Sequence, residues 1–267
     1  MRLRLMASAA GATALAASAL IAAPAQANHA WSDYHWARTA NPFTLKLDNN
    51  VTSAWSSYLS TASSDWTASD KLNTSVQSGS FGSKSTCSPT TGHVEVCNYA
   101  YGNTGWLGIA SISVTTGDHI SRAYVEINDT YFTQAKYNTV AYKHLVMCQE
   151  VGHTFGLDHQ DTNQTNPNLG TCMDYTSNPS GPPSNEHPNS HDYAELDTIY
   201  SHLDSFNTPT LVSGSAAAEA DRAQGTSNQT PAAWGKLVEG SASHGAGTFV
   251  RDLGNGDSTI TYVTWAQ

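Results

Sequence analysis

The chain has 267 residues, 39% of them hydrophobic and 13% charged, and its 12 Lys and Arg against 22 Asp and Glu give a net charge of −10. This length suffices for one sizeable domain with a small appendage. The acidic balance disfavours nucleic acid and anionic membranes, because both would repel it, so we expect neither as a partner.

The first 27 residues have the features of a secretory signal peptide. Arg2 and Arg4 precede an Ala- and Leu-rich run over 5–23, and 25–27 (Ala-Gln-Ala) has the small-x-small pattern of a cleavage site. Removing 27 residues from 267 would leave 240 beginning at Asn28, with 10 basic against 22 acidic residues and a net charge of −12. No later stretch approaches the roughly 20 apolar residues needed to cross a bilayer. The sequence therefore predicts a secreted, extracellular protein.

The next segment, 29–36 (H-A-W-S-D-Y-H-W), is rich in histidine and aromatic residues. A histidine cluster there could bind a metal, but we expect a lead-in segment that packs its aromatic rings on the domain. Apolar residues recur at steps of three or four over 51–66, which predicts an amphipathic helix. Alternating or β-branched apolar runs predict five strands, at 43–47, 72–76, 94–97, 106–114 and 122–127.

A second helix is expected over about 138–155, where apolar residues cover much of the helical surface. It continues into the stretch 148–159, C-Q-E-V-G-H-T-F-G-L-D-H. Gln149 and His153 stand at i and i+4, so both side chains leave one helical face, roughly 5–6 Å apart at Cβ. Gly156 suits the left-handed conformation that ends a helix, and the turn would bring His159 back towards them.

This stretch resembles the metzincin zinc-protease pattern H-E-x-x-H-x-x-G-x-x-H, with Gln149 in the place of the first histidine. The resemblance, to secreted bacterial-type zinc metallopeptidases, implies that His153, His159 and Gln149 hold a zinc ion. The ion would acidify a water molecule and polarise the scissile carbonyl. Glu150 would act as the general base, taking the proton of the water and passing it to the leaving amine.

A second matching segment is 171–175 (T-C-M-D-Y), which resembles the metzincin Met-turn. The resemblance implies that Met173 packs beneath the metal and that Tyr175 stabilises the oxyanion. By the same analogy, the strand at 106–114 is the open edge above the cleft, where an extended protein or peptide substrate would pair.

The glutamine leaves alternatives open. An amide oxygen is a neutral ligand better suited to hard cations than to zinc, so we expect weaker zinc retention than in a three-histidine site. One alternative is a catalytically inactive metzincin fold that acts as an extracellular binding module, which Gln149 favours and Glu150 disfavours. Another is an enzyme that uses a different metal, such as manganese or calcium.

Four cysteines behind a signal peptide suggest two disulfides, with three possible pairings. We favour Cys87–Cys97, which closes a short loop, and Cys148–Cys172, which ties the helix of the motif to the segment carrying Met173. The alternative makes Cys148 a substitute zinc ligand, although it lies about 100° around the helix from Gln149.

The remaining chain contains one more helix, a linker and a β-hairpin. Apolar residues at 191–203 predict the helix, and 207–230 has a linker composition. Strand-like pieces at 248–250 and 259–264 flank the turn Gly254-Asn255-Gly256; this hairpin either packs on the main domain or forms a small accessory element. Four other histidines could be ligands in principle, but we expect packed or solvated side chains at His144, His187, His191 and His202.

We therefore expect an α+β, metzincin-like fold: a twisted mixed β-sheet with a long active-site helix, a Met-turn and a C-terminal helix, plus a small C-terminal β element. The expected division is a signal peptide over 1–27, the catalytic domain over 28–206, the linker and the hairpin element over 231–267. The expected function is that of a monomeric, zinc-dependent endopeptidase acting on a protein or peptide substrate.

Overall fold

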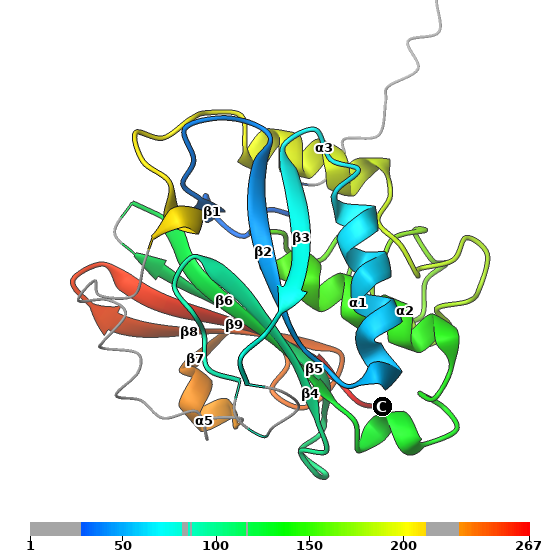
Figure 1. Ribbon diagram of the computed structural model, residues 1–267. Coiled ribbons are helices and arrows are strands. Elements are labelled where there is room, and N and C mark those ends of the chain that lie inside the picture. Colours follow the sequence, from blue (N-terminus) through cyan, green and yellow to red (C-terminus); the bar gives the residue numbers. More distant parts are fainter. Residues whose placement is uncertain (1–27, 82–84, 86, 116, 212–229) are drawn as a thin grey trace, which may run out of the picture.

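The computed structural model describes residues 28–81, 85, 87–115, 117–211 and 230–267, which form a mixed sheet with helices packed against it (Figure 1). The predicted signal peptide and most of the predicted linker lie outside the described residues. The architecture is α+β, as expected.

Nine strands build the sheet, in the order β3-β2-β4-β6-β5-β9-β8-β7, with β1 pairing with the start of β6. The pairs β2–β3, β2–β4 and β4–β6 are parallel, whereas β5, β7, β8 and β9 run antiparallel to their neighbours. The strands comprise β1 (His35–Trp36), β2 (Phe43–Asn50), β3 (Leu72–Ser78), β4 (His93–Tyr99), β5 (Trp106–Thr115), β6 (His119–Asn128), β7 (Lys236–Gly240), β8 (Ala246–Gly254) and β9 (Asp257–Trp265). All five strands expected before the motif, and both pieces of the hairpin, are confirmed.

Two long helices, α1 (Ser53–Trp66) and α2 (Val140–His153), lie side by side against the sheet (Figure 1). The apolar stripe of α1 is buried as its spacing predicts, and the side chain of Thr139 caps α2 by accepting from the amide of Tyr142. The shorter helical pieces are η1 (Tyr131–Thr133), α3 (Ser190–Ile199), η2 (Thr208–Thr210) and α5 (Pro231–Trp234).

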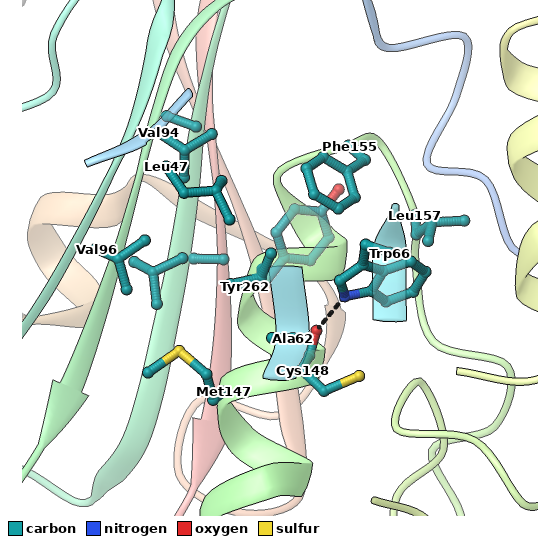
Figure 2. Packing of buried hydrophobic residues seen from close by; sticks show 14 of the residues in the cluster. Leu47, Ala62, Trp66, Val94, Val96, Met147, Cys148, Phe155, Leu157 and Tyr262 are labelled. Carbon is teal, nitrogen blue, oxygen red and sulfur yellow. Dashed lines mark hydrogen bonds between the residues drawn. The ribbon is translucent and has the colours of Figure 1, made fainter. Parts of the chain in front are cut away.

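Packing between α1, α2 and the sheet makes the main core (Figure 2). Trp66 is fully buried, and its indole nitrogen donates to the carbonyl oxygen of Cys148 at 3.1 Å. Both expected disulfides, Cys87–Cys97 and Cys148–Cys172, are present. Because Cys148 is bonded to Cys172, the alternative in which Cys148 replaces a zinc ligand is wrong.

The last predicted helix is shorter than expected. It ends at Ile199, and Tyr200 leaves the helical conformation with its hydroxyl donating to the carbonyl oxygen of Phe155 at 2.9 Å. Leu203, expected on the apolar face, is exposed. The chain after Tyr200 instead turns back along the N-terminal segment, where the amide of Asp204 donates to the carbonyl oxygen of Arg38.

The expectation that β5 is an open edge is also wrong. β9 pairs antiparallel with β5 from Trp106 to Val114, and β8 and β7 extend the sheet beyond it. The reason is burial on both faces of β5. One face joins the main core, and the other joins a second apolar cluster that these strands complete: Trp106, Ile109, Trp234, Phe249, Val263 and Trp265. The C-terminal hairpin is thus continuous with the main sheet.

Candidate functional site

The C-terminal end of α2 brings two of the predicted site residues together. The helix ends at His153, and Gly156 adopts a left-handed conformation with φ of 94°. A Cβ at Gly156 would lie 2.1 Å from the carbonyl oxygen of Tyr34, so only glycine fits this turn. The turn returns the chain so that Nε2 of His159 lies 3.0 Å from Nε2 of His153.

The second nitrogen of each ring faces an oxygen. Nδ1 of His153 donates to the carbonyl oxygen of Leu157 at 2.8 Å, and Nδ1 of His159 lies 3.2 Å from Oδ1 of Asp158. Burial, with His159 facing it, lowers the pKa of His153 to about 3. A neutral His153 whose Nδ1 carries the proton presents a lone pair on Nε2. With Asp158 accepting from His159, both Nε2 atoms direct lone pairs towards one point.

Glu150 and Gln149 lie beneath β9, next to the histidine pair in sequence. Oγ1 of Thr264 lies 2.6 Å from Oε1 of Glu150 and 2.9 Å from Oε1 of Gln149. The amide nitrogen of Gln149 donates to the carbonyl oxygen of Cys172 at 2.8 Å. Burial raises the pKa of Glu150 to about 8, and its Oε2 is buried without a hydrogen-bond partner among the described residues.

The segment 172–175 lies against the same site. Met173 is fully buried under α2, where a Cβ on Gly152 would lie 2.7 Å from its sulfur. The ring of Tyr175 packs edge-on against His159 with centroids 4.7 Å apart. The Tyr175 hydroxyl donates to the carbonyl oxygen of Val263 at 3.3 Å. The disulfide of Cys148 holds this segment to the helix.

β9 covers the site, where the open edge of β5 was expected from the sequence. The ring of Tyr262 stacks on His153, with centroids 4.2 Å apart and planes 2° from parallel. Thr264 stands opposite Gly108 of β5, where a Cβ would lie 2.5 Å from Oε1 of Glu150. The absence of a side chain at Gly108 therefore leaves the space in which Thr264 and Glu150 meet. No local pattern points to these contacts, because Thr264 lies 114 residues from Glu150 in the chain.

Two hollows reach the site. A small cavity of about 20 Å³ is lined by Gln149, Tyr175 and Thr264 together with α2 side chains such as Val146. A second, of about 510 Å³, is lined by Asp158, His159, Glu239 and the N-terminal segment from Asn28 to Tyr34. The side chains of both histidines are buried.

Among the residues that the structure describes, two further groups of side chains could hold a metal ion: His29, His191 and Glu195, and His35, His202 and Asp204. The first group lies between the N-terminal segment and α3, where His29 Nε2 is 3.2 Å from Oδ1 of Asp192. His191 and His202, expected as packed or solvated side chains, belong to these two groups. The rings of His144 and His187 lie with their centroids 5.4 Å apart.

No protein-family model matches the chain, and no curated protein matches it. None of the helices within the described residues is long and apolar enough to cross a membrane. The two disulfides are typical of proteins from oxidising compartments.

Proposed function

We propose that this chain is a secreted, metal-dependent endopeptidase of the metzincin type whose site is closed, in the state described, by its own strand β9. The observation that carries the proposal is the pair His153 and His159, with Nε2 atoms 3.0 Å apart and an oxygen facing each Nδ1. Histidines that ligate metals have such oxygen partners on their second ring nitrogen.

The donor set fits a borderline transition metal such as zinc. Two imidazoles are suitable ligands, and the buried Oε2 of Glu150 has no hydrogen-bond partner among the described residues. The expected third ligand, Gln149, has its amide oxygen engaged by Thr264 while β9 is in place. Removal of β9 would free that oxygen, one helical turn before His153. A divalent ion held there supplies an acidified water and polarises a carbonyl.

The chain's own residues supply the remaining chemistry. Glu150 is protonated near neutral pH in the closed site, because burial raises its pKa to about 8. Entry of water in place of Thr264 would lower that pKa and restore a carboxylate able to take a proton. The hydroxyl of Tyr175 donates to a peptide carbonyl of β9, at Val263. In the open site the same hydroxyl would donate to the carbonyl of a substrate.

β9 has the position that a bound peptide would have, because it pairs antiparallel with β5 and presents a main-chain carbonyl to Tyr175. It is held firmly: Ile260, Tyr262, Val263 and Trp265 are all buried. At about 1.5–3 kcal/mol for each side chain, these contacts amount to about 6–12 kcal/mol, which is comparable to the stability of a whole domain. Thermal motion will not open the site, so the proposed enzyme is a latent form that needs proteolytic removal of β7–β9.

A second function, that of a non-catalytic extracellular binding module, is favoured by one specific observation. Oε1 of Gln149 and Oε1 of Glu150 both have a hydrogen bond to Thr264, so the closed arrangement gives each of these two oxygens a partner without a metal. In this alternative the hairpin is a permanent part of the sheet.

The test uses the chain from Asn28 with a specific protease site placed within the predicted linker 207–230. The intact chain should not hydrolyse casein. After the cut and release of 231–267 in mild urea, the remaining core with zinc should hydrolyse it, and Glu150→Gln, which keeps the shape of the side chain, should abolish the activity. Circular dichroism establishes whether the core stays folded. A folded, zinc-supplied core without Glu150-dependent hydrolysis would show that the peptidase proposal is wrong and leave the binding module.

A further inference from the structure

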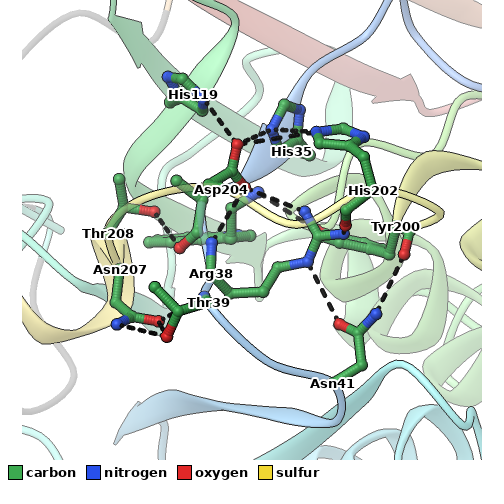
Figure 3. A network of polar contacts seen from close by, with 12 residues as sticks. His35, Arg38, Thr39, Asn41, His119, Tyr200, His202, Asp204, Asn207 and Thr208 are labelled. Carbon is green, nitrogen blue, oxygen red and sulfur yellow. Dashed lines mark hydrogen bonds and ion pairs between the residues drawn. The ribbon is translucent and has the colours of Figure 1, made fainter.

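Three histidines and one aspartate from distant parts of the chain converge at the end of the N-terminal segment (Figure 3). We call His35, His119, His202 and Asp204 the Asp204 cluster. His35 belongs to β1, His119 begins β6, and the other two follow α3. Oδ1 of Asp204 lies 3.2 Å from Nε2 of His119, 3.5 Å from that of His35 and 3.7 Å from that of His202. The Nε2 atoms of His35 and His202 are 3.1 Å apart.

The proton of a neutral His35 ring does not account for its contact with Asp204. Nδ1 of His35 lies 2.6 Å from the carbonyl oxygen of Asp33, which can only accept, so Nδ1 carries the proton of the neutral ring. Nε2 then presents a lone pair to Oδ1 of Asp204, which is also an acceptor. The other oxygen of Asp204 is held by Arg38, through its backbone amide at 3.1 Å and its guanidinium at 3.2 Å. Either Nε2–H of His202 donates to Nε2 of His35, 3.1 Å away, or a cation lies among these nitrogen and oxygen atoms.

The separations fit ligands around one ion. A tetrahedral zinc ion with bonds of about 2.0–2.1 Å holds its ligand atoms about 3.3 Å apart. The three separations among Nε2 of His35, Nε2 of His202 and Oδ1 of Asp204 are 3.1, 3.5 and 3.7 Å, which lie around that value. The longer ones exceed the length of a normal hydrogen bond. The ligand atoms of His35, His202 and Asp204 all lie within 4.8 Å of one another.

An ion can enter this site from solvent. A cavity of about 390 Å³ is lined by His35 and His202 together with residues of the N-terminal segment and α3. The side chains of His35 and Asp204 are 5% and 9% exposed, whereas that of His202 is 50% exposed. Two buried ligands and one at the surface give a binding site with an entry path.

We propose that His35, His202 and Asp204 bind a divalent transition-metal ion, zinc in the first place, with His119 against the same carboxylate oxygen. Imidazole ligands favour zinc, copper or nickel over calcium and magnesium. The ion would cross-link β1 and the segment after α3, so its role is structural. This site is separate from the His153–His159 pair and does not depend on the proposed peptidase activity.

The test is zinc binding by the chain from Asn28, measured by metal analysis after dialysis and by titration against a chelator. His202→Ala should bind one zinc ion fewer than the wild type or bind it at least about tenfold more weakly. His202→Gln, which keeps a polar side chain of similar size, should show the same loss. His244→Ala, which removes an exposed histidine between β7 and β8, is the matched control and should bind as the wild type does.

Thermal unfolding gives a second readout. Zinc at a hundredfold excess over Kd should raise the Tm of the wild type by about 5–10 °C through this site, and the part of the rise due to it should disappear in His202→Ala. His159→Ala separates the other candidate site, because it leaves the His202-dependent ion in place. If His202→Ala and His202→Gln bind as many zinc ions as the wild type, with the same affinity and the same rise in Tm, the Asp204 cluster is a hydrogen-bond network only and the proposal is wrong.

Discussion

The hydroxyl group of Thr264 connects β9 to the candidate site, and its replacement by valine tests how the closed site is held. Its single proton cannot go to both Glu150 and Gln149, whose oxygens lie 2.6 and 2.9 Å away. Because the pKa of Glu150 is raised by burial to about 8, Glu150 is protonated at pH 7 and donates to Thr264. Thr264 then donates to Gln149, and the Gln149 amide donates to the carbonyl oxygen of Cys172.

Thr264→Val keeps the shape of the side chain and breaks this chain of hydrogen bonds. The proton of Glu150 and the carbonyl oxygen of Gln149 would both lose their partner at Thr264 in a buried site, and each such loss costs about 1–3 kcal/mol. We therefore expect the free energy of unfolding to fall by about 2–6 kcal/mol, which lowers Tm by about 4–24 °C in a chain of this size.

The measurement is urea unfolding followed by circular dichroism at pH 7, with Thr264→Ser as the control. Serine keeps the hydroxyl and removes one methyl group, so it should cost only about 1 kcal/mol. In a Glu150→Leu background the further loss from Thr264→Val should shrink, because the acid that it leaves unpaired is gone. The reasoning is refuted if Thr264→Val is no less stable than Thr264→Ser.

Three further predictions concern single side chains. Burial raises the pKa of Glu95 from 4.5 to about 7, so the folded protein holds this proton more tightly than the unfolded chain does. The contribution of Glu95 to stability is therefore greatest below pH 4.5 and is lost as the pH rises to about 7. Glu95→Gln should remove this fall, on the order of 1–3 kcal/mol, between unfolding curves at pH 4 and pH 8; an unchanged difference would contradict it. Gln149→His should tighten zinc binding at least about tenfold in a competition titration, and equal affinity would show that position 149 does not face the ion. Gly156→Ala should lower the free energy of unfolding by about 2–4 kcal/mol in urea, because φ is 94° and the new Cβ would meet the carbonyl oxygen of Tyr34; a loss below 1 kcal/mol would show that the turn can relax.

Much of the fold follows from local patterns. The stripe of α1 and the hairpin turn at Asn255 and Gly256, with φ of 57° and 85°, depend on residues close in sequence, and both were predicted. The end of α3 was not predicted, because it depends on a hydrogen bond between residues far apart in sequence, from the hydroxyl of Tyr200 to the carbonyl oxygen of Phe155. The pairing of β5 with β9 had one sequence indication: β5 carries apolar or small side chains on both faces, which is typical of an interior strand.

The candidate site likewise has a part that local sequence predicts and a part that distant contacts determine. His153 and His159 are six residues apart, and a helix end with a glycine turn suffices to bring them together. Their surroundings come from elsewhere: Tyr262 lies more than a hundred residues away and reaches His153 only through the register of β9 on β5. The Asp204 cluster was missed for the same reason, because its members meet only after three separate segments have packed.

The N-terminal segment 28–36 connects the Asp204 cluster to the histidine pair. His35 lies at one end of it. Nearer its start, the amide of Trp31 donates to the carbonyl oxygen of Gly156 at 3.0 Å, and the carbonyl oxygen of His29 accepts from the amide of Asp158. These bonds flank the turn that positions His159.

Loss of an ion from the Asp204 cluster should therefore make local opening of the turn at 156–158 easier, although the ion has no contact with this turn. We expect His202→Ala, or removal of zinc from the wild type, to increase hydrogen exchange of the amides at 156–158 at least about fivefold, an opening easier by about 1 kcal/mol. The backbone amides within α1 make no hydrogen bond to the segment 28–36 among the described residues. Their exchange should not change, so they serve as the internal control. Equal exchange at 156–158 with and without zinc would mean that hydrogen bonds and packing alone fix the segment, whatever the Asp204 cluster binds.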